Sequence, residues 1–389
     1  MGFSRKNTAA QPRSSNIELY RVVTMVLIVL HHYTVNSGLL AADGPVFADV
    51  MSPRSLFLLI IGAWGKTGIN CFVLITGYFM CRSRITLRKF TKLLLEVMFY
   101  KIIISLIFWL TGYAPFSWTE LLKALLPVRT VGTGFVPAYL VFFLCIPFLN
   151  ILIANLSERQ HVYLLLLLGF VYVFLGTVPS FSVTMNYVSW FAVLYFLASY
   201  IRLYPKKLFD SRRFWGWATV FFVVVSACSV VVCAWLGRII NKNIAYYFVT
   251  DSNTLLAVCT ALSSFLFVKN TKVSYNRFIN RLGASAFGVL LIHASSDTMR
   301  QWLWQDMLNC TGMYDSLWMP VHAIGSALLI FAVCFIVDSL RIRFLETPIF
   351  TLWDRYESKF INKFQNAERK ICNRLHISYA NDGEQEKKT

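Results

Sequence analysis

Charge is scarce in this chain of 389 residues, of which only 14% are Asp, Glu, Lys or Arg. An ordinary soluble domain carries about 25% charged and about 45–50% apolar residues, whereas 57% of this chain is hydrophobic. The shortage of charge therefore excludes a water-soluble globular protein. Aromatic residues, at 16%, exclude intrinsic disorder, because disordered segments are poor in aromatic and branched aliphatic side chains.

Acidic residues are scarcer than basic ones, 19 against 37, which gives a net charge of +18. A basic balance can indicate nucleic-acid binding, but that function needs a basic patch on a folded surface. Here the basic residues lie between long apolar stretches. The pattern is typical of a polytopic membrane protein, and we expect no nucleic-acid partner.

The nine cysteines form no metal-ligand pattern, and we expect no metal cofactor. Most of them lie in or beside apolar stretches, and only Cys310 falls in a loop that we expect to be external. A disulfide framework is therefore not expected.

Ten apolar stretches are long enough to cross a bilayer, which takes about 20 residues in a helix. They are residues 18–39, 56–80, 91–112, 135–155, 160–178, 186–203, 214–236, 247–268, 284–305 and 319–340. The predicted fold is an all-α membrane helix bundle of about ten transmembrane helices. Residues 1–15 form an N-terminal tail, 16–348 the membrane domain and 349–389 a C-terminal tail. Three glycines in the second stretch, Gly62, Gly65 and Gly68, predict a kink or a close helix contact there.

The distribution of Lys and Arg predicts the orientation, because basic loops stay on the cytoplasmic side. Most of the 37 basic residues precede the first stretch or follow an even-numbered one. Both termini are therefore expected to be cytoplasmic, and the number of spans is expected to be even.

Among the polar residues of the first stretch are Arg21 and His32, separated by eleven positions. At about 100° per residue they share one helix face, about 16 Å apart along the axis. A guanidinium can hold phosphate in a bidentate fashion, and an imidazole can act as a general base near neutral pH. The spacing alone is equally compatible with a structural role for both residues. In that interpretation Arg21 extends to the lipid headgroups and His32 makes a hydrogen bond to another helix. Glu18, three residues before Arg21, is placed to orient or neutralise it.

Together with three later segments, this pair resembles the acyltransferase-3 family of integral membrane acyltransferases. The pattern of Arg21, ten residues and His32 is similar to a signature of that family. The later segments are GINCFVLITGYF from Gly68, PAYLVFFLCIPFL from Pro137 and GASAFGVLLIH from Gly283. These matches occur in order between about residues 16 and 348.

The sequence departs from the family pattern at several positions. Asn70 stands where the family usually has Asp, and Thr76 stands in place of Ser. Tyr139 lacks the Trp that normally precedes it. Arg84 and Arg88 are four residues apart, where the family has basic residues three apart. Because position 70 is Asn and not Asp, a carboxylate role there is in doubt.

The resemblance implies an enzyme that moves an acyl group, commonly acetyl, from cytoplasmic acetyl-CoA to a hydroxyl of a surface or lipid-linked polysaccharide. Its expected home is the bacterial inner membrane. It implies that His32 is catalytic and that Arg21, Arg84 and Arg88 bind the phosphates of coenzyme A. His32 would either deprotonate the acceptor or first accept the acyl group.

Five further polar residues are candidates for supporting or acceptor-side roles. Asn70 and Thr76 would stabilise an oxyanion if they face the same cavity as His32. For Asn70, a hydrogen bond to a neighbouring helix is an equally good interpretation. Tyr139 is a further candidate in the fourth stretch. His293 and Asp297, four residues apart, are expected on one helix face; they either orient the acceptor or form a structural pair.

A transporter or flippase for a lipid-linked glycan is the alternative function. Many transporters show internal repeats with matching broken helices, and no such repeat is visible here. A non-catalytic membrane scaffold or sensor is a further alternative, but it leaves the shared face of Arg21 and His32 unexplained.

Overall fold

The computed structural model describes residues 14–356 except 84, 130, 133, 182 and 184, and in this part the protein contains helices and no strand. The helices are α1 (Ser15–Val35), α2 (Pro45–Ala48), α3 (Pro53–Gly62), α4 (Gly65–Met80), α5 (Leu87–Leu110), α6 (Trp118–Leu125), α7 (Phe135–Asn155), α8 (Glu158–Leu168), η1 (Gly169–Phe174), α9 (Leu175–Thr177), α10 (Tyr187–Leu203), η2 (Lys207–Asp210), α11 (Arg212–Ile240), α12 (Leu255–Lys269), α13 (Arg277–Ala284), α14 (Ala286–His293), α15 (Asp297–Gln301), η3 (Trp302–Met307), α16 (Met319–Arg341) and η4 (Ile342–Glu346). The all-α prediction is confirmed.

Each of the ten predicted stretches contains a helix, and six helical segments in the described part are long and apolar enough to cross a membrane. They are Pro53–Met80, Leu87–Leu110, Phe135–Asn155, Glu158–Thr177, Arg212–Ile240 and Met319–Tyr356. The helices α10 and α12 are apolar but shorter. The first stretch, α1, carries Glu18, Arg21, His31 and His32, and these polar residues lower its mean hydropathy. The count of ten and the orientation stay predictions.

The prediction of a continuous ninth span over residues 284–305 is wrong. The chain forms α14, leaves helical geometry at Ala294, and starts α15 at Asp297 with Ser296 as the N-cap. The segments Arg277–His293 and Asp297–Met307 meet at 96°. The hydropathy pattern could not show this break, because no Pro or Gly marks it.

The chain divides into two compact units, Met1–Ile336 and Val337–Thr389. In the described part of the second unit, the Arg341 guanidinium bonds the carboxylates of Asp338 and Glu346, each at 2.9 Å. All of the candidate site lies in the first unit.

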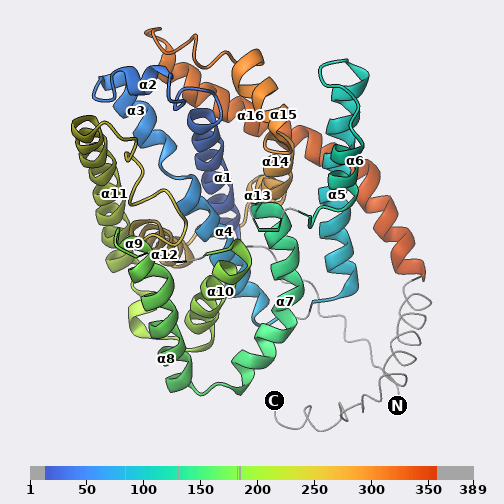
Figure 1. Ribbon diagram of the computed structural model, residues 1–389. Helices are drawn as coiled ribbons and strands as arrows, with labels where there is room; N and C mark the ends of the chain where they lie inside the picture. The colour runs from blue at the N-terminus through green and yellow to red at the C-terminus, as the bar shows by residue number, and fades with distance from the viewer. Residues whose placement is uncertain are drawn as a thin grey trace, which may run out of the picture. The chain divides into compact units, whose positions relative to one another are not determined.

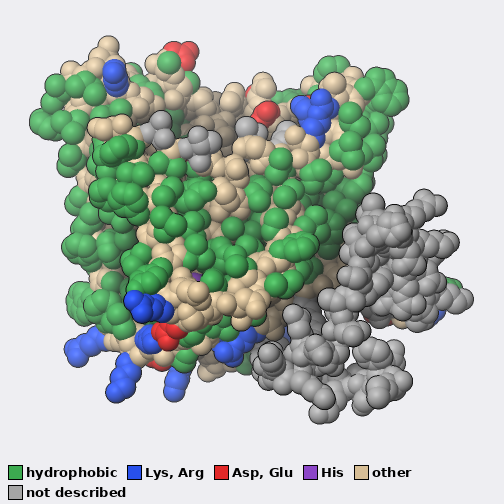
Figure 2. Space-filling view, turned by 60° about the horizontal axis from the view of Figure 1, so that its bottom comes forward, with side chains coloured by type: hydrophobic (Ala, Val, Ile, Leu, Met, Phe, Trp, Pro, Cys, Tyr) green, Lys and Arg blue, Asp and Glu red, His purple; other side chains and the backbone are tan. Residues whose placement is uncertain are grey.

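Two large clusters of buried apolar side chains and a third, small one form the interior of the described part of the first unit. One large cluster joins α1 to α3, α11, α14 and η3 around Met25, Tyr33 and Trp304. The other large cluster joins α4, α7, α10 and α12, with Trp190 and Tyr195 fully buried. The outward faces are also apolar, as Leu110 and Phe148 illustrate with exposures of 78% and 72%. Figure 2 shows hydrophobic side chains over most of one face, with Lys and Arg gathered along its lower edge.

Helix α1 is packed closely against the helices that surround it, α3, α4, α13 and α14 (Figure 1). A Cβ on Gly65 would overlap the His31 ring, and one on Gly68 would lie 2.7 Å from the Ile28 side chain. The predicted close helix contact at these glycines is therefore confirmed. On the other side, a Cβ on Gly283 would overlap Glu18, so the last turn of α13 lies beside the first turn of α1.

Candidate active site

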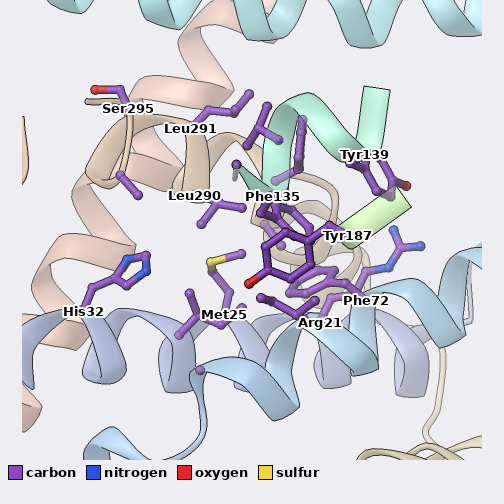
Figure 3. Close-up of a pocket in the computed structure, with 18 of the residues that line it drawn as sticks. Arg21, Met25, His32, Phe72, Phe135, Tyr139, Tyr187, Leu290, Leu291 and Ser295 are labelled. Atoms are coloured by element: carbon purple, nitrogen blue, oxygen red, sulfur yellow. The ribbon is translucent and has the colours of Figure 1, made fainter. Parts of the chain in front are cut away.

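A cavity of about 460 Å³ opens between α1, α4, α5, α7 and the segment from α13 to α15. Apolar side chains make up much of its wall, including Met25, Phe72 and Leu290 (Figure 3). The polar and ionisable residues that line it are Arg21, His31, His32, Lys66, Thr76, Glu96, Lys101, Tyr139, Tyr187, Ser295 and Arg300.

Arg21 and His32 both line this cavity, as the prediction of a shared helix face requires. Figure 3 shows both side chains rising from the same helix, with Met25 between them. Arg21 lies 3.7 Å from the Glu18 carboxylate, the partner that its spacing indicates. The Nε atom of Arg21 is buried and has no hydrogen-bond partner among the described residues. One end of the cavity thus presents a guanidinium with an unused donor, and the other end presents an imidazole.

A chain of two hydrogen bonds determines which nitrogen of His32 carries a proton. The Nδ1 atom of His293 lies 2.6 Å from the Val289 carbonyl oxygen, which can only accept, so this nitrogen is the donor. In a neutral imidazole the other nitrogen accepts, so His293 Nε2 accepts from His32 Nδ1 across 3.0 Å. The network therefore assigns the lone pair of His32 to Nε2, at the outer edge of its ring.

His31 is bound in the opposite direction around α1. Its Nδ1 atom donates to the Gly62 carbonyl oxygen at 2.6 Å, at the end of α3. The glycine at position 65 gives the His31 ring the room that it occupies. The adjacent histidine therefore fixes α1 against the break between α3 and α4, and in this way holds His32 in place.

Thr76 and Tyr139 form a polar pair at the Arg21 end of the cavity. Their hydroxyl oxygens are 3.1 Å apart, and Thr76 also donates to the Phe72 carbonyl oxygen. Figure 3 shows the Arg21 guanidinium close to Tyr139.

The sequence was also compared with protein-family models, curated proteins and solved structures. The model of the acyltransferase-3 family, described as "Acyltransferase domain", matches residues 14–338. The chain belongs to the acyltransferase-3 family. Searches of curated proteins and of solved structures returned no significant match. The protein is therefore a membrane acyltransferase.

The two residues that were predicted to stabilise an oxyanion if they face the cavity, Asn70 and Thr76, differ in position. Asn70 does not line the cavity: its amide donates to the Ser252 carbonyl oxygen at 2.6 Å and accepts from the Trp190 indole at 2.9 Å. With these partners, Asn70 makes buried hydrogen bonds that connect α4 to neighbouring segments. Thr76 lines the cavity, but it lies ten residues along α4 from Lys66, which is beside His31. Ten residues of helix span about 15 Å, so Thr76 lies about that far from the His32 end of the cavity. Neither residue is placed to bind an oxyanion at His32.

The predicted pairing of His293 with Asp297 is also wrong, because the helix breaks between them. Asp297 begins α15, where its side chain is 97% exposed and bonds Arg300 at 2.6 Å. His293 is fully buried and bonds His32 instead. The sequence singled out both histidines but could not show that they meet.

The predicted phosphate-binding residues of the acyltransferase differ in position. Only Arg21 lines the cavity. Arg88 lies in the first turn of α5, outside the cavity lining, and Arg84 falls outside the described residues.

Sequence reasoning missed three cations that line the cavity, Lys66, Lys101 and Arg300. Lys66 donates to the Tyr187 hydroxyl at 2.8 Å, and Lys101 approaches the Ser295 carbonyl oxygen at 3.5 Å. An ionisable residue inside an apolar stretch is itself a functional indication, and this rule would have selected all three, because each lies inside a predicted stretch. Among the described residues, no group of three or more His, Cys, Asp or Glu side chains is placed to hold a metal ion.

Proposed function

We propose that this acyltransferase is an O-acetyltransferase that moves an acetyl group from cytoplasmic acetyl-CoA to a hydroxyl of a surface or lipid-linked polysaccharide in the bacterial inner membrane. One observation carries the proposal: Arg21 and His32 open into one cavity, and the hydrogen-bond network leaves the His32 Nε2 lone pair available. A phosphate-binding group and a general base are thus separated by about 16 Å along α1.

The donor would bind with its charged nucleotide end toward Arg21. The buried Nε atom, which lacks a partner among described residues, is a donor that a phosphate oxygen can satisfy in a charge-assisted bond. The pantetheine arm then reaches along the cavity toward His32. The apolar lining, which includes Met25 and Leu290, suits this uncharged arm.

In direct transfer, His32 Nε2 takes the proton of the acceptor hydroxyl while the hydroxyl oxygen attacks the thioester carbonyl carbon. The tetrahedral intermediate collapses with cleavage of the carbon–sulfur bond, and the leaving thiolate of coenzyme A takes the proton from His32. In the second route, His32 Nε2 itself attacks the thioester carbonyl carbon, and the carbon–sulfur bond breaks to release the thiolate of coenzyme A. The acceptor hydroxyl then attacks the carbonyl carbon of the acetyl-imidazole, the bond from this carbon to Nε2 breaks, and the hydroxyl proton passes to the thiolate. Both routes require the lone pair at Nε2 and the proton at Nδ1.

The oxyanion of the intermediate needs a donor near His32, and Lys66 is the best-placed candidate. It follows Gly65, which is packed against the His31 ring, and it lines the same cavity. Its charge lies near enough to act on both histidine rings. A cation held there by the Tyr187 hydroxyl would lower the energy of the developing negative charge.

The proposal is tested with His32→Ala and Arg21→Ala in native membranes, with transfer of labelled acetyl from acetyl-CoA to the cell's own glycans as the readout. We expect His32→Ala to lower the rate by about 10²–10⁴-fold, the usual contribution of a general base. Full transfer by both variants at normal protein levels would refute the proposal. A deletion strain whose glycan is exported but unacetylated would exclude the transporter alternative; a glycan retained inside the cell would support it.

A further inference from the structure

The cavity of this acyltransferase has a second cationic region at the end opposite Arg21. The direction of α14 establishes which end this is, because Gly283 lies against Glu18 and His293 lies against His32. The chain thus runs alongside α1 from the Arg21 end to the His32 end. Ser295 and Arg300 follow His293, and both line the cavity there.

Lys101 reaches this region from α5. Its ammonium group lies 3.5 Å from the Ser295 carbonyl oxygen, and its charge lies close enough to Arg300 for the two cations to act on each other. Arg300 in turn lies near enough to act on the His32 ring. Two side chains of like charge from different helices therefore converge beside the proposed base.

The neighbouring carboxylates do not occupy all of the hydrogen-bond donors of Lys101 and Arg300. Asp297 engages one terminal nitrogen of Arg300, and Glu120 on α6 is paired with Lys123 at 2.6 Å. The Arg300 Nε atom is buried and has no hydrogen-bond partner in the described part of the chain. The ammonium of Lys101 has one long contact with a neutral carbonyl oxygen. An oxyanion between Lys101 and Arg300 would satisfy the unused donor and relieve the repulsion of the two cations.

We infer that Lys101 and Arg300 form an anion site for the acceptor, which selects a glycan with a carboxylate or phosphate group next to the hydroxyl that is acetylated. The inference rests on the proposed function. The donor cannot supply this anion once its phosphates lie at Arg21, because the acetyl thioester that it presents to His32 carries no charge. Arg300 is 40% exposed in its side chain, so the site is open to a long polymer.

The first experiment measures anion binding without catalysis, on the full chain purified in lipid nanodiscs at constant ionic strength. The probes are methyl β-glucuronide, glucose 6-phosphate and, as the neutral match, methyl β-glucoside. We expect the anionic sugars to raise the unfolding midpoint of the wild type and of His32→Ala, and methyl β-glucoside to leave it unchanged. Whichever anionic sugar gives the larger shift identifies carboxylate or phosphate as the group recognised.

The variants Lys101→Met and Arg300→Gln should each weaken binding of the anionic sugar by at least about tenfold, because each removes a charge-assisted bond. The matched control is Arg54→Gln, which removes an exposed cation that is paired with Asp315 and lies outside the cavity lining; its binding should equal that of the wild type. Equal shifts with all three sugars, or unchanged binding in both cavity variants, would overturn the inference.

The second experiment measures transfer from labelled acetyl-CoA to cell glycans that have been separated by anion exchange into acidic and neutral fractions. We expect label in the acidic fraction, and in Lys101→Met and Arg300→Gln a raised KM for that fraction with little change in KM for acetyl-CoA. Equal labelling of both fractions, with no effect of the two variants, would overturn the inference and leave the proposed function intact. Anion binding without any transfer by the wild type would refute the proposed function and leave the anion site intact.

Discussion

The proposed base of this acyltransferase depends on a second histidine that does not line the cavity. His293 is fully buried, and its two nitrogens are used for Val289 and His32. It thereby sets the tautomer of His32 without contact with a substrate. In this arrangement His293 is a positioning residue, comparable in effect to the group that orients a catalytic histidine in many hydrolases.

This role predicts different outcomes for two substitutions of similar size. In His293→Gln the side-chain amide oxygen can still accept the proton of His32 Nδ1, whereas His293→Leu removes the acceptor. We expect kcat to fall by about tenfold or less in the Gln variant and by about 10²-fold or more in the Leu variant, with KM for acetyl-CoA nearly unchanged in both. Kinetics in membranes, normalised to the amount of folded protein, measure this difference. Equal activity of the two variants would show that the bond does not position His32.

Arg21 permits a parallel test of donor binding. Arg21→Lys keeps the charge but loses the planar pair of donors that matches a phosphate. We therefore expect an increase in KM for acetyl-CoA of about tenfold in Arg21→Lys and a larger one in Arg21→Ala. In both variants kcat at saturating donor should stay within a fewfold of the wild type. A fall in kcat without a change in KM would place Arg21 in the chemical step instead.

At the scale of helices, the site depends on how closely α1 approaches α4. The atoms of His31 that a Cβ on Gly65 would overlap lie near the α1 backbone, so a small side-chain rotation cannot relieve the clash. The same packing places Lys66 beside the two histidines. Small residues at helix contacts are a general means of close approach in membranes.

We expect Gly65→Ala to reduce transfer strongly by moving α1 away from α4, even where the protein still inserts into the membrane. Gly325→Ala is the matched control, since nothing lies within 4 Å of a Cβ at that position in α16. This control should retain full activity and gain up to about 1 kcal/mol in helix stability. Thermal unfolding in detergent and acetyl transfer in membranes are the measurements. Full activity in Gly65→Ala would contradict the requirement for a close approach.

The sequence predicted single helices better than it predicted the meetings between them. Apolar length located a helix in each stretch, and the helical period placed Arg21 and His32 on one face. By contrast, the bond between His32 and His293 joins residues 261 positions apart, and no periodicity within one helix contains that information. The break after His293 was missed for a similar reason. The new helix starts at the N-cap Ser296, and a hydropathy average over a whole stretch does not detect a single capping residue.

At the scale of the whole protein, the orientation in the membrane is a prediction that labelling can decide. Single cysteines are placed in a cysteine-free background at Leu317, which is 89% exposed before α16, and at Lys207, which is exposed after α10. With both termini cytoplasmic, Leu317→Cys should react with an impermeant maleimide on intact cells, and Lys207→Cys only after the membrane is permeabilised. The reverse pattern would place the Arg21 end of the cavity outside and would exclude donor binding from the cytoplasm.

The bend after His293 also bears on how a sugar polymer reaches the proposed base. A peptide group without a partner costs several kcal/mol in hydrocarbon, so a turn of this kind has to lie against protein or water. Ala294 and Ser295, which form the turn, line the cavity. The non-helical backbone thus borders the cavity, and we expect a hydrophilic acceptor to approach His32 along it without being dissolved in the lipid phase.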